Sequence, residues 1–242
     1  MSVPYKIVGH RLCPYVQRVV IVMREKGIAF ERTDIDLDNK PFWLQDISPG
    51  RQVPVFRVGP DDWLFESGVI ACYLDRISGG GLMPGDPLAR ARHEAWMGYA
   101  DGLLSIVARI IYRDAGASAL STSMTELAER LKIVDERFRP RPYFAGEAFG
   151  LVDAVFATLF RYFPALDAAS DAKLETGLPR ALADWWTVVR RRASVMDAVP
   201  RTYEAELIRF IAAKKSHAGQ VLAQLHVRMH EGRRQQTAWI RR

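Results

Sequence analysis

The stretch YKIVGHRLCPYVQRVVIVMREKG, residues 5–27, decides the fold. Its first five residues predict a short strand, residues 10–12 a loop, and residues 14–26 a helix. Apolar side chains recur at helical spacing along that helix, which predicts one buried face: Val16, Val19, Val20 and Met23. Gln17, Arg18, Arg24 and Glu25 fall outside this face. Pro14 suits the first helical turn and Gly27 the C-terminal cap, so the stretch predicts a strand–loop–helix unit with a cysteine at the helix start.

Cys13 is the candidate reactive group of this unit. A thiol at the first turn faces unpaired backbone N–H groups and the positive end of the helix dipole, and both favour the reactive thiolate. We therefore expect this thiol to ionise near neutral pH. Val16 stands where a C-x-x-C motif has its second cysteine, so a local dithiol cycle is excluded and a single-thiol mechanism with an external thiol remains. The alternative is a buried, inert cysteine.

The composition is that of a globular protein. The chain has 242 residues, of which 49% are hydrophobic and 26% charged, and this length suffices for two modest domains or one large one. Nothing approaches the ~18 apolar residues of a membrane span, and the N-terminus lacks the layout of a signal peptide. The two cysteines, Cys13 and Cys72, argue against a disulfide framework. We therefore expect a cytoplasmic location and no membrane span. Cys72 lies within the apolar stripe of residues 69–77, so we expect it to be a buried core residue and not a resolving thiol.

The net charge of +6 resides in residues 201–242, which hold nine Lys and Arg against three Glu. A basic tail can attract nucleic acid or anionic lipid. The alternative is a solvated extension, which we favour because no nucleic-acid-binding motif accompanies the tail. We therefore expect no nucleic-acid partner.

The first third of the chain alternates strand-like and helix-like stretches. After the first strand and helix come a strand at 29–36, a helical turn at 41–47, strands at 54–58 and 63–65, and a helix at 69–77. The order βαβ predicts a parallel pair with a right-handed crossover, and the two closely spaced strands predict an antiparallel hairpin on the same sheet.

A boundary follows at Ser78-Gly79-Gly80-Gly81 and the Pro- and Gly-containing residues 82–87, and strand patterns stop after it. The expected fold is an α/β N-terminal domain followed by an all-α domain. The expected division is a first domain at 1–78, a linker at 79–88, a helical domain at 89–215 and a basic extension at 216–242. The helices of the second part are predicted at 89–113, 125–139, 151–167, 179–193, 203–215 and 217–229.

Several short motifs in order resemble the cysteine-type glutathione S-transferases, an omega-like class near the dehydroascorbate reductases and the lambda class. They are Cys13-Pro14-Tyr15, Asn39-Lys40-Pro41, Gln52-Val53-Pro54-Val55, Glu66-Ser67, Ile70 and Tyr73-Leu74. The likeness is dense over residues 5–87 and is one of layout beyond them. It implies a thioredoxin-like first domain, an all-helical second domain, a homodimer, glutathione as co-substrate and no metal.

The resemblance also implies a role for residues around Cys13, the implied catalytic residue. A cis bond before Pro54 would turn the Val53 backbone toward the cysteinyl part of glutathione, where an ordinary trans proline is the alternative. Ser67 would cap the following helix and hold the γ-glutamyl carboxylate, while Glu66 would pair with the ammonium; a plain helix cap is the alternative. The remaining implied glutathione contacts are Lys40, for the glycyl carboxylate, Leu37 and Tyr15. The alternatives are a solvated surface lysine at Lys40 and a packing role for Tyr15.

In the helical half, the resemblance places a second-substrate pocket on the first long helix, where the same aromatic residues could instead be core. The candidates are Trp96, Tyr99, Arg109 and Tyr112. The segment Phe149-Gly150-Leu151-Val152-Asp153 resembles the helix-capping box of the family, with Gly150 replacing the hydroxyl residue. Asp153 can still accept a bond from the cap N–H.

These implications favour one function over two others. The favoured function is glutathione-dependent thiol transfer: deglutathionylation, or reduction of dehydroascorbate or glutathionyl ketones. The first alternative is a non-catalytic glutathione-binding or regulatory protein, which the basic tail favours. The second is a glutathione-dependent isomerase or lyase, which the N-terminal motifs do not separate from thiol transfer.

Overall fold

The computed structural model describes residues 5–138 and 141–227. Its sheet has four strands in the order β2-β1-β3-β4, namely β1 (Lys6–Gly9), β2 (Glu31–Asp34), β3 (Val55–Arg57) and β4 (Trp63–Leu64). β1 runs parallel to β2 and antiparallel to β3, and β4 is antiparallel to β3. The predicted βαβ unit and hairpin are both confirmed.

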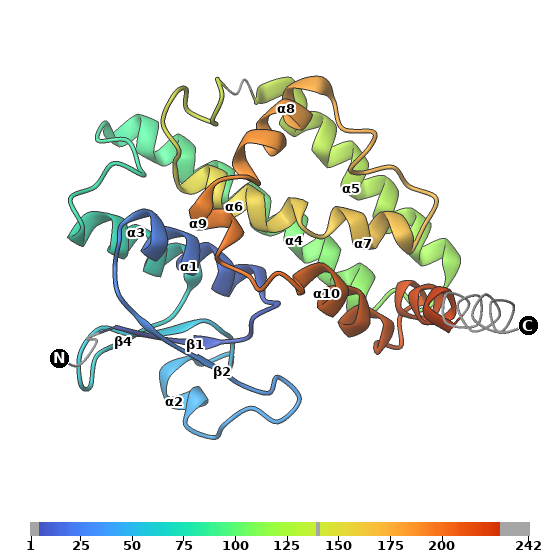
Figure 1. Ribbon diagram of the computed structural model, residues 1–242, viewed down its shortest axis with the longest axis horizontal. Helices are drawn as coiled ribbons and strands as arrows, with labels where there is room; N and C mark the ends of the chain where they lie inside the picture. Colours follow the sequence, from blue (N-terminus) through green and yellow to red (C-terminus); the bar gives the residue numbers. More distant parts are fainter. Residues whose placement is uncertain (1–4, 139–140, 228–242) are drawn as a thin grey trace, which may run out of the picture. The chain divides into compact units, whose positions relative to one another are not determined.

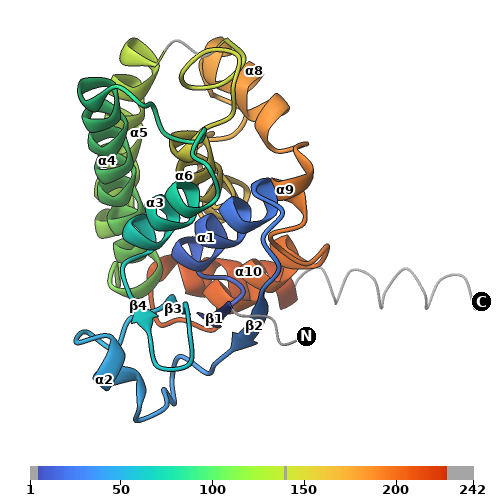
Figure 2. The same cartoon turned by 90° about the vertical axis from the view of Figure 1, so that its left-hand side faces the viewer.

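Two helices cover one face of the sheet, α1 (Pro14–Glu25) and α3 (Ser67–Ile77), and the short α2 (Leu44–Ile47) lies on the other face (Figures 1 and 2). Strand alternation supplies the two apolar surfaces. Val8 and Val55 form a buried cluster with Leu44 of α2. Ile7 and Phe56, paired across β1 and β3, are fully buried and alternate with them, so they face the layer of α1 and α3.

α1 is buried around its whole circumference from Val16 to Met23, including Gln17 and Arg18. The prediction that these two polar residues lie outside the buried face is therefore wrong. The helix packs against α3, α6 (Leu151–Phe160) and α9 (Ala193–Met196) as well as the sheet, so it has no solvent side along this stretch. Its C-terminal end follows the prediction, because Gly27 has a φ of 61°.

The remaining helices are α4 (Pro87–Tyr112), α5 (Ala117–Arg137), α7 (Phe163–Ala168), α8 (Arg180–Val189) and α10 (Tyr203–Ala212), and residues 217–227 are also helical. The single helix predicted over 151–167 is two helices, α6 and α7. Pro164 lies in the first turn of α7, where its ring is incompatible with continuing the helix through Phe160. Met229, in the last predicted helix, lies outside the described residues.

α5 begins eight residues before the predicted start at Thr125. These eight residues are rich in Ser and Ala, so the sequence shows no helical repeat of apolar residues there. Leu120 and Met124 are nevertheless buried four residues apart, so tertiary packing extends the helix. Among the described residues, no helix combines the length and the apolarity needed to cross a lipid bilayer.

Over the described residues the chain divides into two compact units. The first comprises residues 5–101, 138, 141–160 and 180–201, and the second residues 102–137, 161–179 and 202–227. The first unit thus contains the sheet together with α6, α8 and α9. In the second, α7 packs against α10, and the His217 N–H donates to the Asp114 carbonyl at 2.7 Å.

Asp153 organises the helical part of the first unit. Its carboxylate is fully buried and accepts hydrogen bonds from the Gly150 N–H at 2.9 Å, the Phe144 N–H at 2.9 Å and the Trp185 indole N–H at 2.7 Å. The predicted return bond to the cap N–H is confirmed. Three donors satisfy a carboxylate that would otherwise be costly to bury.

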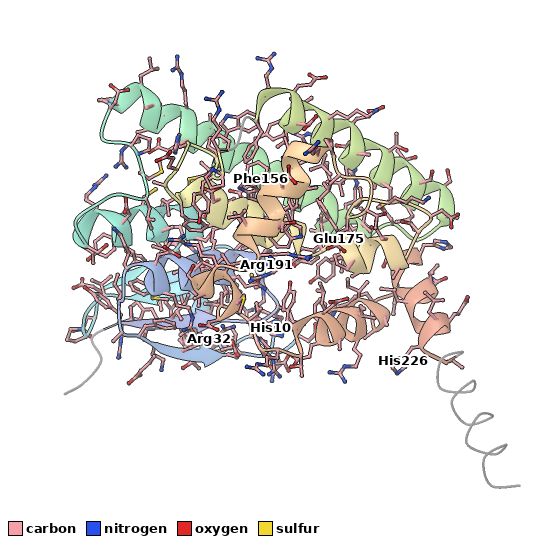
Figure 3. All side chains as sticks on the ribbon, turned by 45° about the horizontal axis from the view of Figure 1, so that its top comes forward. His10, Arg32, Phe156, Glu175, Arg191 and His226 are labelled. Atoms are coloured by element: carbon pink, nitrogen blue, oxygen red, sulfur yellow. The ribbon has the colours of Figure 1, made fainter. Side chains whose placement is uncertain are left out.

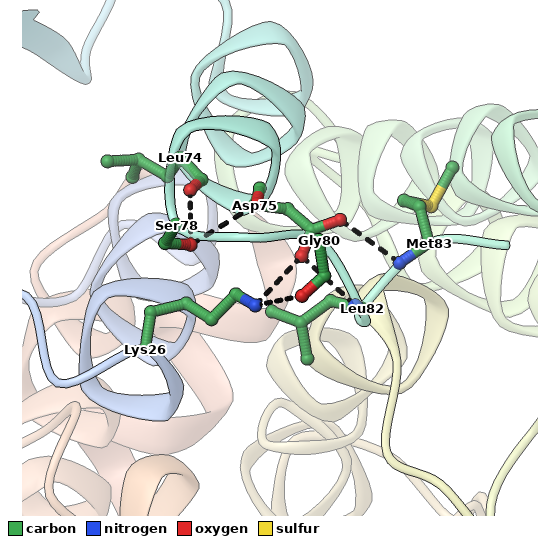
Figure 4. Close-up of polar contacts among 7 residues, drawn as sticks. All are labelled: Lys26, Leu74, Asp75, Ser78, Gly80, Leu82 and Met83. Atoms are coloured by element: carbon green, nitrogen blue, oxygen red, sulfur yellow. Dashed lines mark hydrogen bonds and ion pairs between the residues drawn. The ribbon is translucent and has the colours of Figure 1, made fainter. Parts of the chain in front are cut away.

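A second buried carboxylate, Asp75, holds the segment after α3 (Figure 4). It accepts hydrogen bonds from the Leu82 N–H at 3.0 Å and the Met83 N–H at 3.2 Å, and it pairs with the Lys26 ammonium at 3.2 Å. Lys26 also donates to the Gly80 carbonyl. The Gly-rich stretch predicted as a linker is therefore tied to the C-terminal ends of α1 and α3.

Glu25 and Arg192 join α1 to the turn before α9. The Arg192 guanidinium donates to both Glu25 carboxylate oxygens, at 2.5 and 2.6 Å, and Ser194 adds a third hydrogen bond. Burial tends to raise the pKa of Glu25, but the hydrogen bonds from Arg192 and Ser194 outweigh it and lower that pKa. The Glu25 side chain is 9% exposed, so its bidentate pair is screened little by water.

We predict that Arg192→Met lowers the free energy of unfolding by about 3 kcal/mol, because it leaves a buried carboxylate without its cation. Urea denaturation measures the change. The matched control is Arg180→Met, whose pair with Asp184 spans 3.7 Å and is exposed on both sides. Surface pairs contribute about 0–1 kcal/mol, so equal losses in the two variants would contradict the prediction.

The contribution of the Glu25–Arg192 pair to stability should depend on pH. Since the folded state lowers the pKa of Glu25, the pair stabilises the fold above the ordinary value of about 4.3 and loses this contribution as the pH falls below it. The stability difference between the wild type and Arg192→Met should therefore shrink between pH 5 and pH 3, as followed by denaturation at each pH. A difference that stays constant over this range would exclude the linkage.

Candidate functional site

Cys13 is the N-cap residue of α1, with φ −72° and ψ 122°. Its N–H donates to the His10 carbonyl at 2.9 Å, which closes the turn from β1 into the helix. Its thiol faces the Val53 carbonyl, with 3.9 Å between Sγ and the oxygen. The Val53–Pro54 bond is cis, as predicted. The structure thus brings the candidate thiol and the proposed backbone-pairing residue together across 40 positions of sequence.

Burial raises the pKa of the Cys13 thiol. The N–H groups of Val16 and Tyr15 and the guanidinium groups of Arg18 and Arg32 act in the opposite direction but do not overcome it. The direction of this shift argues against the expectation that the thiol ionises near neutral pH, and that expectation stays a prediction. The helix N-terminus supplies the favourable dipoles, but the half-buried position of Cys13 limits the water that can solvate a thiolate.

Tyr15, Glu66 and Ser67 line one pocket of about 620 Å³ in the first unit. Glu66 is exposed and occupies a left-handed conformation with φ 66°, which is rare for a residue other than glycine and is typical of functional positions. The helix begins at Ser67, and Glu66 is the N-cap residue without a side-chain capping bond. The prediction that Ser67 caps this helix is therefore wrong, since Ser67 is already in its first turn.

The loop at Lys40 is fastened to the segment before Val53. The Lys40 ammonium donates to the Arg51 carbonyl at 2.9 Å, and the Arg51 guanidinium donates back to the Lys40 carbonyl at 2.9 Å. An ammonium has three donors, so Lys40 keeps capacity for a carboxylate. Leu37 is half-buried in the loop after β2, and Pro54 is buried.

Tyr15 stays protonated at physiological pH. Burial and the nearby Asp101 raise the pKa of its hydroxyl to about 12, although Arg18 acts in the opposite direction. The Arg18 guanidinium lies 4.9 Å from the centre of the Tyr15 ring. Tyr15 therefore offers the site a hydroxyl that can donate a hydrogen bond.

His10 and Arg32 lie near the turn that carries Cys13 (Figure 3). The His10 Nδ1 atom accepts the Leu12 N–H at 3.3 Å. Burial lowers the pKa of His10, partly opposed by Asp34, so the imidazole is neutral at physiological pH. His10 therefore shapes the turn without adding positive charge beside the thiol.

The four candidates for a second-substrate pocket divide between the two units. Trp96 and Tyr99 belong to an aromatic cluster of the first unit, with 5.5 Å between their ring centres. Arg109 pairs with Glu126 of α5 in the second unit, and Tyr112 contacts Phe210 there edge-on. A shared pocket of these four residues stays a prediction.

Sequence reasoning missed part of the pocket. Cys72 lines it and is half-buried, so the expectation of a core residue is wrong. The pocket-lining residues of α4 also escaped notice: Glu94, Met97, Gly98 and Asp101. Their spacing is that of one helix face, so periodicity could have grouped them. Only the fold shows that this face meets α3.

We predict that the alkylation rate of Cys13 by iodoacetamide rises about tenfold per pH unit from pH 6.5 to 8.5, because only the small thiolate fraction reacts. Peptide mass spectrometry follows the adduct at each pH, and Cys13→Ser identifies the background from Cys72. The rate should level off only above the ordinary thiol pKa of about 8.5. A plateau reached below pH 7.5 would show a thiol that ionises readily.

Comparison with known proteins agrees with this arrangement. The family models for the N-terminal and C-terminal domains of glutathione S-transferases match residues 12–77 and 96–193. Glutathione S-transferase U28 of Arabidopsis thaliana is 30% identical over 78% of this chain and 85% of its own length. Glutathione S-transferase omega-1 of Sus scrofa is 27% identical over 67% and 68%, respectively.

Solved structures show the same fold. Rice GST1 in complex with glutathione has a TM-score of 0.76 and 27% identity, covering 87% of this chain and 96% of that one. The Tau class enzyme of mango has a TM-score of 0.74 and 24% identity, covering 86% and 98%. With both domain models matched in order and a relative at 30% identity, the chain belongs to the glutathione S-transferase family of enzymes.

Proposed function

We propose that this chain is a cysteine-type, omega-like member of its family and carries out glutathione-dependent thiol transfer. The observation that carries the proposal is the position of Cys13, at the N-terminus of α1 with its Sγ atom 3.9 Å from the Val53 carbonyl. A sulfur in this place can form a disulfide with a glutathione whose backbone pairs with Val53.

The cycle has two exchange steps. The Cys13 thiolate attacks the glutathionyl sulfur of a mixed disulfide, forms a Cys13–glutathione disulfide and expels the other thiolate. The thiolate of a second glutathione then attacks the glutathionyl sulfur, leaves as glutathione disulfide and restores the Cys13 thiolate. The second glutathione supplies the electrons, because its sulfur is oxidised to the disulfide while the sulfur of the expelled thiol is reduced, so no second protein cysteine is needed.

The surrounding residues would hold the tripeptide. The Val53 N–H and C=O would pair with its cysteinyl segment as an added strand. Ser67 and the N–H groups at the start of α3 would receive the γ-glutamyl carboxylate, and Glu66 its ammonium. Lys40 would use its remaining donors for the glycyl carboxylate. Tyr15 lines the pocket, and Leu37, which is not among its described lining residues, would contact the tripeptide from the loop after β2.

The test compares the reduction of hydroxyethyl disulfide by the wild type and by Cys13→Ala in the presence of glutathione. We expect the variant to lose at least about 100-fold in kcat/KM, because the covalent intermediate cannot form. Mass spectrometry of the wild type should find one glutathionyl adduct on Cys13. Equal rates for the two proteins would remove Cys13 from the mechanism.

Conjugation of glutathione to electrophiles is the second candidate, and the raised pKa of Cys13 favours it because a thiolate is scarce at neutral pH. Cys13→Ser separates the two functions, since a hydroxyl can hold the glutathione thiolate but cannot form a disulfide. A thiol transferase should lose disulfide reduction in this variant and gain conjugation of 1-chloro-2,4-dinitrobenzene. A wild type that conjugates as fast as the variant would support the second candidate.

Glutathione affinity chromatography separates these enzymes from a regulatory protein. Retention on the column and elution by glutathione support an enzyme with an intact tripeptide site, and no retention supports a non-catalytic role. An isomerase or lyase would be retained, would lack disulfide reductase activity and would still depend on Cys13.

We also propose that the protein is a homodimer. Val69 and Ile77 are exposed apolar residues on α3, Phe65 is exposed just before that helix, and Leu88 is exposed in the first turn of α4. Exposed apolar patches often mark surfaces that are buried against a partner. Light scattering should give the dimer mass for the wild type and the monomer mass for Val69→Glu. Val188→Glu, at an exposed position on α8, should remain a dimer.

A further inference from the structure

The second unit contains a cavity of about 890 Å³ that the proposed thiol exchange does not use. Three segments line it: residues 117–132 of α5, residues 168–179 at the end of α7 and in the loop after it, and residues 217–225 of the last described helix. It shares no described lining residue with the pocket of Tyr15 and Ser67. A cavity of this size is typical of a site for a small organic ligand.

The walls of this cavity are aliphatic on all three segments. They include Leu120 and Met124 of α5, Leu174 and Leu178 of the loop, and Val221 and Leu225 of the last helix. Leu225 remains 38% exposed, so contact with an apolar ligand would remove further apolar surface from water. Among the described lining residues there is no aromatic side chain, so the walls offer aliphatic contacts and no ring stacking.

The loop wall is held in place by its own hydrogen bonds. The Asp167 carboxylate accepts the Leu174 N–H at 2.7 Å and the Glu175 N–H at 3.0 Å, and the Gly177 N–H donates to the Lys173 carbonyl at 2.7 Å. A Cβ atom at Gly177 would lie 2.4 Å from that carbonyl oxygen, so this tight turn requires glycine. A wall fixed in this way lowers the cost of ordering the site when a ligand binds.

The charges on the cavity favour a negatively charged ligand. Lys132 and Lys173 both line it and are exposed, and within residues 5–138 and 141–227 neither ammonium has a hydrogen bond or an ion pair. Asp171 is the one carboxylate among the described lining residues, and it pairs with neither lysine. An anion would therefore meet two cations against one carboxylate, whereas a cation would meet net repulsion.

We propose that this cavity is a second ligand site, which binds an aliphatic carboxylate. The chain lies against the aliphatic walls, and the carboxylate accepts hydrogen bonds from Lys132 and Lys173, each of which has three donors. The inference does not rest on the proposed thiol transfer, because the two sites have no described lining residue in common.

The test uses isothermal titration calorimetry of the full chain with decanoate, 1-decanol and decylammonium, each below the concentration at which it self-associates. Decanoate should bind at a single site, and 1-decanol about 3- to 10-fold more weakly because it lacks the charge. Decylammonium should bind most weakly. No binding of decanoate overturns the proposal, and a cavity filled by another part of the chain or by a second copy gives that result. Equal affinities for the three ligands also overturn it.

Substitutions of the charged residues test the role of the two lysines. The double variant Lys132→Gln/Lys173→Gln should bind decanoate about 3- to 10-fold more weakly and 1-decanol within about 1.5-fold of the wild type. Asp171→Asn should act in the opposite direction and tighten decanoate binding about twofold. The matched control is Lys215→Gln, at an exposed lysine of the same unit outside the lining, which should change neither affinity. Equal losses for decanoate and 1-decanol in the double variant overturn the proposal.

A cavity-filling substitution locates the site. Ala128 lines the cavity from α5, so Ala128→Phe should weaken the binding of decanoate and 1-decanol by at least about 10-fold. Ala119→Phe, at an exposed position of α5 outside the lining, should leave both affinities unchanged. Unchanged binding in Ala128→Phe overturns the proposal. If this variant does not fold, as judged by near-ultraviolet circular dichroism, the substitutions of the charged residues decide the question.

Competition with glutathione separates this inference from the proposed function. Saturating glutathione and the Cys13→Ala substitution should both leave the affinity for decanoate unchanged, whether or not Cys13 proves to be catalytic. Displacement of decanoate by glutathione would assign the carboxylate to the glutathione pocket and overturn the proposal.

Discussion

The burial of α1 on all sides is the constraint on which the rest of the site depends. The helix packs on the sheet and against α3, α6 and α9, and no polar residue from Val16 to Met23 escapes this enclosure. Such packing fixes the direction of the helix axis and therefore the place of its first turn, where Cys13 meets the Val53 carbonyl. A reactive group on a rigid helix end is held more accurately than one on a free loop.

The packing that positions Cys13 also disfavours the formation of its thiolate. Removing water from the sulfur raises the pKa of Cys13, while the helix N–H groups and the buried guanidinium lower it. Packing that holds the thiol in place therefore also limits the solvation of its thiolate.

Most elements of the first domain were predictable from local pattern. The alternation of strand and helix at residues 5–77, the cap at Gly27 and the capping bond of Asp153 all follow from short-range chemistry. The misses have physical causes beyond the local pattern. α5 starts early because Leu120 and Met124 find partners in the fold, and the break before α7 shows the effect of one proline within a long apolar run.

The sequence by itself determined the strand–loop–helix unit and the thiol at the helix start, because hydrophobic period, Pro14 and Gly27 act over a few residues. It also determined the family, because several motifs recur in the right order. Only the tertiary structure decided that Arg18 is enclosed, that Cys72 faces a pocket and that Asp101 of α4 joins residues of α3 there. These facts depend on contacts between helix faces that lie far apart in the sequence. The same contacts set the local dielectric, which affects the ionisation of the Cys13 thiol.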